Sequence, residues 1–204
     1  MRVPAGLATP AAAHAYLARL WQRAVVAPYD DVRGLLLRAM GAVYRLHAAA
    51  EPALDCVPYL AALLRAPAAA PPPVAVAALA LLRDAFAHPP NLLAFVSDEG
   101  GVSLLSQLLL RLPLPHALAR LAEDDAEPPP PAAAGHHGAQ EEEEEAAVGA
   151  LALELLQRLA IGSRRVSRAL CCAPHLPRIA QAILSGGAAV VSRASELLGA
   201  LADA

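Results

Sequence analysis

The amino-acid sequence predicts an all-α fold built from stacked helical units, and three observations support this prediction. Apolar residues recur at helical spacing almost throughout the chain, whereas the sustained alternation typical of β-strands is absent. Proline and glycine residues divide the chain into short segments. One helical phrase also recurs with its apolar residues in register. Repeats of such length indicate supersecondary units that stack because none can bury its apolar face alone.

The repeated phrase is clearest at residues 74–110. Shifted forward by 74 positions, its apolar residues coincide with apolar residues near the end of the chain. The pairs are Leu81 and Leu155, Leu82 and Leu156, Phe95 and Ala169, Val96 and Leu170, Val102 and Leu176, Leu105 and Ile179, Leu109 and Ile183, and Leu110 and Leu184. A shift back by 45 positions pairs Val102, Leu105, Leu108 and Leu109 with Val57, Leu60, Leu63 and Leu64, and Leu81, Leu82 and Arg83 with Leu36, Leu37 and Arg38.

The pattern predicts ten helices in order along the chain. Their expected ranges are 11–26, 31–49, 52–65, 74–88, 90–97, 102–111, 146–160, 164–171, 175–185 and 188–203. Most of the gaps between them contain proline or glycine, the residues that commonly start or stop a helix. These breaks lie at 71–73, 89–90, 100–101, 162, 174 and 186–187.

One segment, Glu123–Glu145, departs from the helical pattern. It holds nine of the nineteen acidic residues and four consecutive prolines, and it has no large apolar residue. Such a segment buries too little apolar surface to offset its ordering entropy, so we expect a disordered loop. The helical phrase continues beyond it, which indicates an insertion within one unit.

Composition and charge disfavour several classes of function. The net charge of −3 and a pI near 6.1 predict no general attraction to nucleic acid or anionic membranes. Three cysteines do not make a disulfide framework, which indicates an intracellular protein of the cytoplasm or nucleus. The first 29 residues contain arginines but no acid before Asp30, so a mitochondrial presequence remains an alternative.

No arrangement of residues predicts catalysis or a cofactor. The sequence lacks a glycine-rich phosphate loop, a zinc-protease helix motif and a nucleophile elbow, so we expect a protein that is not an enzyme. Cys171, Cys172 and His175 are the nearest approach to a metal site. Structural zinc sites use spaced ligand pairs, whereas these cysteines are adjacent, so we predict no metal and two small buried thiols.

The phrase LALLRDAFAHPPNLLAFVSDEGGVSLLSQLLLRL, residues 79–112, resembles an armadillo repeat, and HEAT-type repeats are a related alternative. In that family a short first helix ends at a glycine, and a second helix and a long third helix follow. Gly100–Gly101 matches this turn, whereas residues 172–174 replace it in the later unit. The resemblance implies a right-handed armadillo- or HEAT-like α-solenoid of three to four units. Its domains would be an N-terminal helix, possibly a cap, at 1–30 and repeats at 31–122 and 146–204, separated by the insertion at 123–145.

The resemblance also implies a function, because third helices line a concave groove in armadillo-type solenoids. Arg38, Arg83 and Gln157 occupy equivalent positions, and Arg158 follows directly. We therefore expect a protein–protein interaction scaffold whose groove accepts an extended or helical segment of a protein partner. A solvated helix face is the alternative explanation of these residues. The family's import receptors carry a Trp/Asn ladder, which this chain lacks.

The sequence is also compatible with other partners and functions. The final helix keeps an apolar face with no polar capping unit after it, which predicts self-association, a bound partner or a longer natural chain. A regulatory clamp on a chaperone or ATPase, like an exchange factor, is one alternative function. A weak nucleic-acid adaptor is another, and it would use a patch of arginines: Arg164, Arg165, Arg168 and Arg178.

Overall fold

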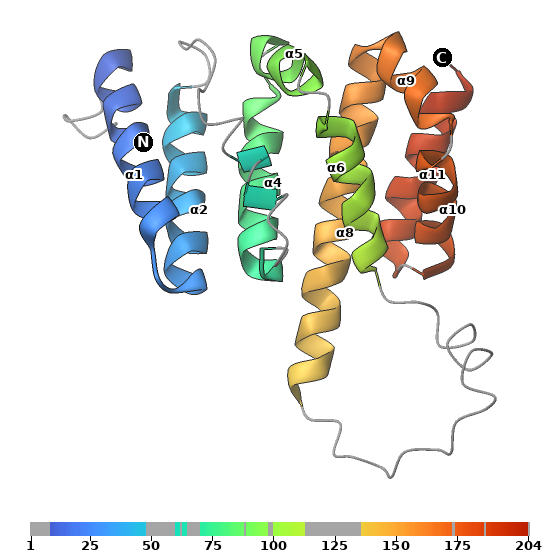
Figure 1. Cartoon of the computed structure of the whole chain (residues 1–204), viewed down its shortest axis with the longest axis horizontal. Helices are drawn as coiled ribbons and strands as arrows, with labels where there is room; N and C mark the ends of the chain where they lie inside the picture. Colours follow the sequence, from blue (N-terminus) through green and yellow to red (C-terminus); the bar gives the residue numbers. More distant parts are fainter. Residues whose placement is uncertain are drawn as a thin grey trace. The chain divides into compact units, whose positions relative to one another are not determined.

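The computed structural model shows an all-α protein, which confirms the all-α part of the predicted fold class (Figure 1). It describes residues 9–47, 60–61, 63–64, 70–87, 89–97, 100–112, 136–172, 174–185 and 187–203. No strand occurs in these ranges. The chain divides into two compact units, Met1–Leu104 and Leu105–Ala204, and the boundary falls within one helix.

Five helices with described bounds lie wholly or partly in the first unit. They are α1 (Pro10–Val26), α2 (Asp30–His47), α4 (Pro72–Ala85), α5 (Pro89–Ser97) and the first residues of α6 (Gly101–Leu108). Helix α1 begins at Thr9, whose side chain accepts a hydrogen bond from the Ala12 nitrogen, and Pro10 suits the first helical position. The predicted helix at 52–65 lies mostly outside the described residues. Its described residues Leu60, Ala61, Leu63 and Leu64 are helical.

Helices α2 and α4 run parallel and pack closely through two glycines of α2. A Cβ atom at Gly34 would lie 3.7 Å from the carbonyl oxygen of Pro73, at the start of α4. A Cβ atom at Gly41 would lie 3.9 Å from Leu81, two turns further along α4. The seven-residue spacing brings both glycines to the same face of α2. The two helices therefore meet along their length, with Leu37, Met40 and Leu82 buried between and around them.

Helix α5 is attached to α2 and α4 by buried polar and aromatic contacts. The Asn91 side chain is 1% exposed, and its amide nitrogen donates to the Tyr44 hydroxyl (2.8 Å) and to the Ala85 carbonyl (3.0 Å). This carbonyl lies in the last turn of α4, where helix carbonyls lack intrahelical partners. The rings of Phe86 and Phe95 meet edge to face, 5.1 Å apart.

Among its described residues, the second unit has the end of α6 and five further elements. They are η2 (Leu109–Arg111), α8 (His136–Gly162), α9 (Arg164–Leu170), α10 (His175–Ser185) and α11 (Ala188–Ala202). Helices α8 and α11 lie side by side and run parallel, and α10 runs antiparallel to α11 (Figure 1). The buried apolar residues of α8 form the centre of this unit: Val148, Leu153, Leu155, Leu156 and Leu159.

Helix α8 begins ten residues earlier than the sequence predicts, so part of the expected disorder is wrong. Residues 136–145 are the first turns of this helix, whereas residues 123–135 lie outside the described residues. Glutamate, glutamine and alanine have high helix propensity. A segment with nothing apolar to bury can therefore extend a helix whose later turns are packed.

Half of the eight residue pairs predicted from the repeated phrase lie in similar environments. Leu105 and Ile179 are both buried, whereas Leu110 and Leu184 are 53% and 67% exposed. The first helices of the two phrases differ by one position, because Phe95 is buried and its predicted counterpart Ala169 is exposed. The buried residue next to Ala169 in α9 is Leu170, so Phe95 corresponds to Leu170 and the offset for this helix is 75 residues.

Candidate interaction surface

The predicted groove residues belong to two separate units, with two residues in each. Arg38 lies on α2 and Arg83 on α4, in the first unit. Gln157 and Arg158 lie on α8, in the second unit. Arg38 and Arg158 are exposed, and Arg83 and Gln157 are half-buried.

In the first unit, Asp84 organises the charged residues of α2 and α4. Its side chain is 12% exposed, and it forms an ion pair with Arg45 of α2. Its other carboxylate oxygen, Oδ1, lies 3.8 Å from the Nε atom of Arg83. Neither Asp84 nor Arg45 was identified from the sequence, because their pairing depends on how α2 and α4 are aligned.

Arg38 differs from Arg83 in that none of the described residues forms a hydrogen bond or an ion pair with its guanidinium. One of its terminal nitrogens lies 3.7 Å from the position that a Cβ atom at Gly34 would occupy. Arg38 therefore lies close to the contact between α2 and α4 while its donors remain available to an incoming group.

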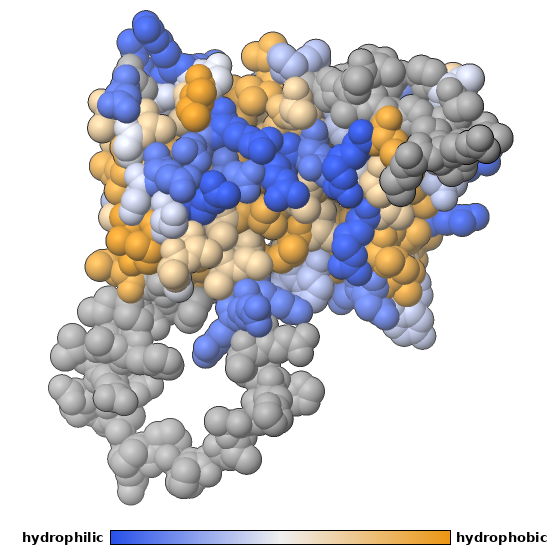
Figure 2. Space-filling view, turned by 180° about the vertical axis from the view of Figure 1, so that it is seen from behind, coloured by the Kyte–Doolittle hydropathy of each residue, from blue (hydrophilic) through white to orange (hydrophobic). Residues whose placement is uncertain are grey.

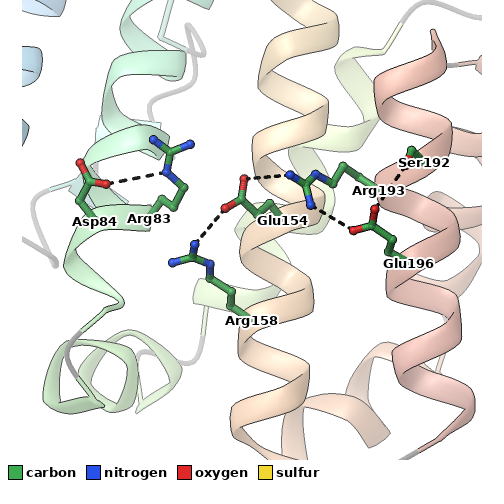
Figure 3. Close-up of polar contacts among 7 residues, drawn as sticks. All are labelled: Arg83, Asp84, Glu154, Arg158, Ser192, Arg193 and Glu196. Carbon is green, nitrogen blue, oxygen red and sulfur yellow. Dashed lines mark hydrogen bonds and ion pairs between the residues drawn. The ribbon is translucent and has the colours of Figure 1, made fainter.

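In the second unit, Glu154 of α8 forms ion pairs with Arg158 of the same helix and with Arg193 of α11 (Figure 3). Its side chain is 16% exposed. Oε1 lies 3.1 Å from Nη2 of Arg158, and Oε2 lies 3.9 Å from Nη2 of Arg193. Arg193 also binds Glu196 at 3.0 Å, and Ser192 donates to the same carboxylate at 3.3 Å. This network orders the side chains on one face of two neighbouring helices.

The α8–α11 face, defined by Glu154, Gln157, Arg158, Arg193 and Glu196, is a mixed-charge surface. Figure 2 shows hydrophilic residues gathered over α8 and α11. Two arginines and two glutamates balance one another, so this face has little net charge. Such a surface suits hydrogen bonding to a polypeptide better than attraction to a polyanion.

The four arginines of the predicted basic patch differ in their surroundings. Arg164, Arg165 and Arg168 are exposed on α9 and bind no described residue. Arg178 of α10 instead donates from Nη1 to the Ser106 hydroxyl at 3.1 Å. Arg178 is half-buried, and its guanidinium is already hydrogen-bonded within the protein.

Ser106 and His175 form the closest approach to a catalytic pair in the described residues. Ser106 Oγ and His175 Nδ1 are hydrogen-bonded at 2.8 Å. Burial, and secondarily the positive charge of Arg178, lowers the pKa of His175 below its usual 6.5. Ser106 is completely buried, however, so its hydroxyl cannot reach a substrate. These groups instead join the end of α6 to α10.

The prediction of buried thiols at the end of α9 is wrong. Cys171 and Cys172 are both exposed, because the buried face of this short helix consists of Val166, Ser167 and Leu170. In the described part of the chain, no group of three or more His, Cys, Asp or Glu side chains could hold a metal ion. None of the helices there combines the length and apolar character needed to cross a membrane.

Comparisons of this chain with protein-family models, with curated proteins and with solved structures found no match.

Proposed function

We propose that this protein is a non-catalytic interaction scaffold of the armadillo kind, which binds a segment of a partner protein on the polar faces of its long helices. The observation that supports this most directly is common to both units. In each, two parallel helices lie side by side and present charged residues that are linked across the helix pair.

The order of the elements also supports the armadillo interpretation. Helices α9, α10 and α11 have 7, 11 and 15 residues, the succession of short first, longer second and long third helix that the resemblance implies. Helices α5 and α6 are also short, with 9 and 8 residues, and they precede the long α8 with 27 residues, although the insertion separates α8 from them. The helices that the resemblance assigns as third helices are α2, α4, α8 and α11, and the predicted binding residues lie on the first three of these.

Binding would use side chains that are already ordered. Arg158 and Arg193 are positioned by Glu154, so an incoming segment loses less side-chain entropy than it would on a mobile surface. Their remaining N–H groups can donate to peptide carbonyls or carboxylates. Gln157 adds an amide that both donates and accepts.

Charge reversal in each unit tests this proposal. We expect Arg38→Glu or Arg158→Glu to weaken binding of a captured partner roughly tenfold or more, because a repulsive charge would replace a donor. Arg19→Glu is the matched control, since Arg19 is an exposed arginine of α1 that binds no described residue. Partners are captured from native lysate, and their affinities are then measured with purified components.

A photo-crosslinking amino acid locates the contact directly. Placed at Gln157, it should crosslink to the partner found by capture, whereas at the exposed Ala15 of α1 it should not. Equal crosslinking from both positions, or equal losses in Arg19→Glu and Arg158→Glu, would show that these faces do not form the binding surface.

A further inference from the structure

The arginines of the second unit are distributed in an unusual way. Between Glu154 and Glu196 the sequence has no acidic residue, but it has six arginines. They are Arg158, Arg164, Arg165, Arg168, Arg178 and Arg193. Arg158 and Arg193 bind Glu154, and Arg178 binds Ser106. The three arginines of α9 remain without a partner among the described residues.

Helix α9 holds these three side chains outward. Val166 and Leu170 are buried on its opposite face, and the Ser167 hydroxyl donates to the Ala160 carbonyl of α8 at 2.8 Å. Positions 164 and 168 are one turn apart, and position 165 is adjacent, so the three guanidinium groups lie on one side of a fixed helix. We call this set, Arg164, Arg165 and Arg168, the α9 basic patch.

An opposite charge lies on the first turns of α8. Glu142 and Glu143 are exposed there and bind no described residue, and they belong to a run of five glutamates at positions 141–145. In Figure 1 these turns extend past the ends of α10 and α11, whereas α9 lies at the other end of α8. The two charged groups therefore lie at opposite ends of one helix.

The length of α8 prevents these groups from meeting within one chain. At about 1.5 Å per residue, Glu143 lies about 28 Å from the C-terminal end of α8, where α9 begins. Even if the seven residues of α9 folded back along α8, they would recover only about 10 Å of this distance. The gap exceeds both an ion-pair distance and the Debye length of about 8 Å at physiological salt.

We propose that the α9 basic patch binds Glu142 and Glu143 of a second copy of this chain. Charge complementarity supports this choice of occupant, since three arginines that have no partner among the described residues match two exposed glutamates that the same molecule cannot bring to them. The contact joins two different surfaces and is therefore head to tail, so each copy retains one unoccupied patch and one unoccupied pair of glutamates. Association of this kind continues beyond a dimer.

Sedimentation velocity of the full chain tests the proposal. In reducing buffer, which prevents disulfides through Cys171 and Cys172, the wild-type protein should form dimers and larger species at about 0.02 M salt and dissociate at about 0.5 M. The Arg165→Glu/Arg168→Glu variant should remain a monomer, and so should Glu142→Arg/Glu143→Arg. The far-ultraviolet circular dichroism of each variant should match that of the wild type.

Recombination of the two variants makes the test specific. A one-to-one mixture pairs the intact patch of one variant with the intact glutamates of the other, and the reversed patch with the reversed glutamates, so it should form dimers and larger species although each variant alone is a monomer. The chain with all four substitutions carries both charges exchanged, and it should again form species larger than a dimer. Because neither experiment involves Arg38, Arg83 or Arg158, its failure would leave the proposed scaffold function untouched.

Three outcomes would overturn the proposal. The wild type could remain monomeric at low salt, each variant alone could associate as the wild type does, or the one-to-one mixture of the two variants could remain monomeric. Binding of a single-stranded oligonucleotide that depends on Arg165 and Arg168, without self-association, would instead assign the α9 basic patch to nucleic acid.

Discussion

At the scale of single residues, Gly101 leaves no room for a side chain. A Cβ atom at Gly101 would lie 2.6 Å from the Phe95 carbonyl oxygen and 2.8 Å from its ring. Phe95 is buried and its ring meets Phe86, so it cannot move away freely. Glycine at this position lets the start of α6 approach the end of α5.

We expect Gly101→Ala to destabilise the protein by about 1–3 kcal/mol, because the methyl group overlaps a fixed backbone atom and a packed ring. Gly199→Ala is the matched control. Nothing lies within 4 Å of the added Cβ atom there, and Gly199 is inside α11. Alanine should therefore stabilise that helix by about 0.5–1 kcal/mol. Urea unfolding measures both changes, and equal effects at the two positions would refute the close contact with Phe95.

Single residues also show which features of the structure can be predicted from the local sequence. The turn at Gly100–Gly101 was predicted because two glycines interrupt a helical pattern, and α6 begins at Gly101. The exposure of Cys171 and Cys172 was predicted wrongly, since exposure depends on which face of α9 packs against α8. A one-residue shift in register decides that face, and composition carries no information about it.

At the scale of elements, α6 and α10 are joined by hydrogen bonds that also depend on protonation. Ser106 accepts from Arg178 and is hydrogen-bonded to His175. Burial of the imidazole disfavours a proton on His175 and lowers its pKa, and the positive charge of Arg178 adds to this effect. The folded protein therefore favours the neutral imidazole.

This preference predicts a loss of stability on acidification. The pKa of His175 is lower in the folded state than its usual 6.5, so the unfolded chain takes up the proton first as the pH falls. The contribution is complete above pH 6.5 and is lost as the pH falls from there toward the folded pKa. Urea midpoints at about pH 7.5 and about pH 5.5 should differ more for the wild type than for His175→Asn, which keeps an acceptor near Ser106 but does not titrate.

The other histidines of the chain contribute equally to the pH dependence of stability in the wild type and in His175→Asn, so their contributions cancel in this comparison. A variant with the same pH response as the wild type would exclude His175 as the cause.

Element boundaries were predictable where packing sets them and less so elsewhere. Helices α9, α10 and α11 agree with the predicted ranges to within one residue, because proline and glycine lie next to buried periodic residues. The start of α8 was missed by ten residues, because helix propensity extends it without burial. The pair Glu154 and Arg158 has helical i,i+4 spacing and could have been recognised. The link from Glu154 to Arg193 needs the alignment of two helices, which the sequence does not supply.

At the scale of the whole molecule, the segment between η2 and α8 separates two elements that the second unit brings together. The Leu112 side chain packs against Gly149, in the middle of α8. The part of the intervening sequence at 123–135 carries four acids and four prolines and no large apolar residue. The fold of the unit should therefore be independent of it.

Deletion of residues 123–135 should leave the helical circular dichroism signal and the unfolding midpoint unchanged. The ten residues 113–122 remain as a connection and can span up to about 33 Å when extended. The rise from position 136 to Gly149 is only about 20 Å. A deletion variant with much less helix, or one that unfolds at clearly lower urea concentration, would show that this segment contributes to the folded core. Replacement of the same residues by a Gly/Ser linker of equal length is the control for chain length.

The buried hydrogen bonds of Asn91 also bear on how the protein ages. Asparagine deamidates when the next backbone nitrogen attacks its side-chain amide, a reaction that needs a mobile backbone and water. Asn91 is the only asparagine in the chain, and its amide is buried and bonded to Tyr44 and Ala85. Folded molecules are therefore protected from this form of chemical damage. The rate at which aspartate appears at position 91 in stored protein would therefore measure how often α5 detaches from α2 and α4.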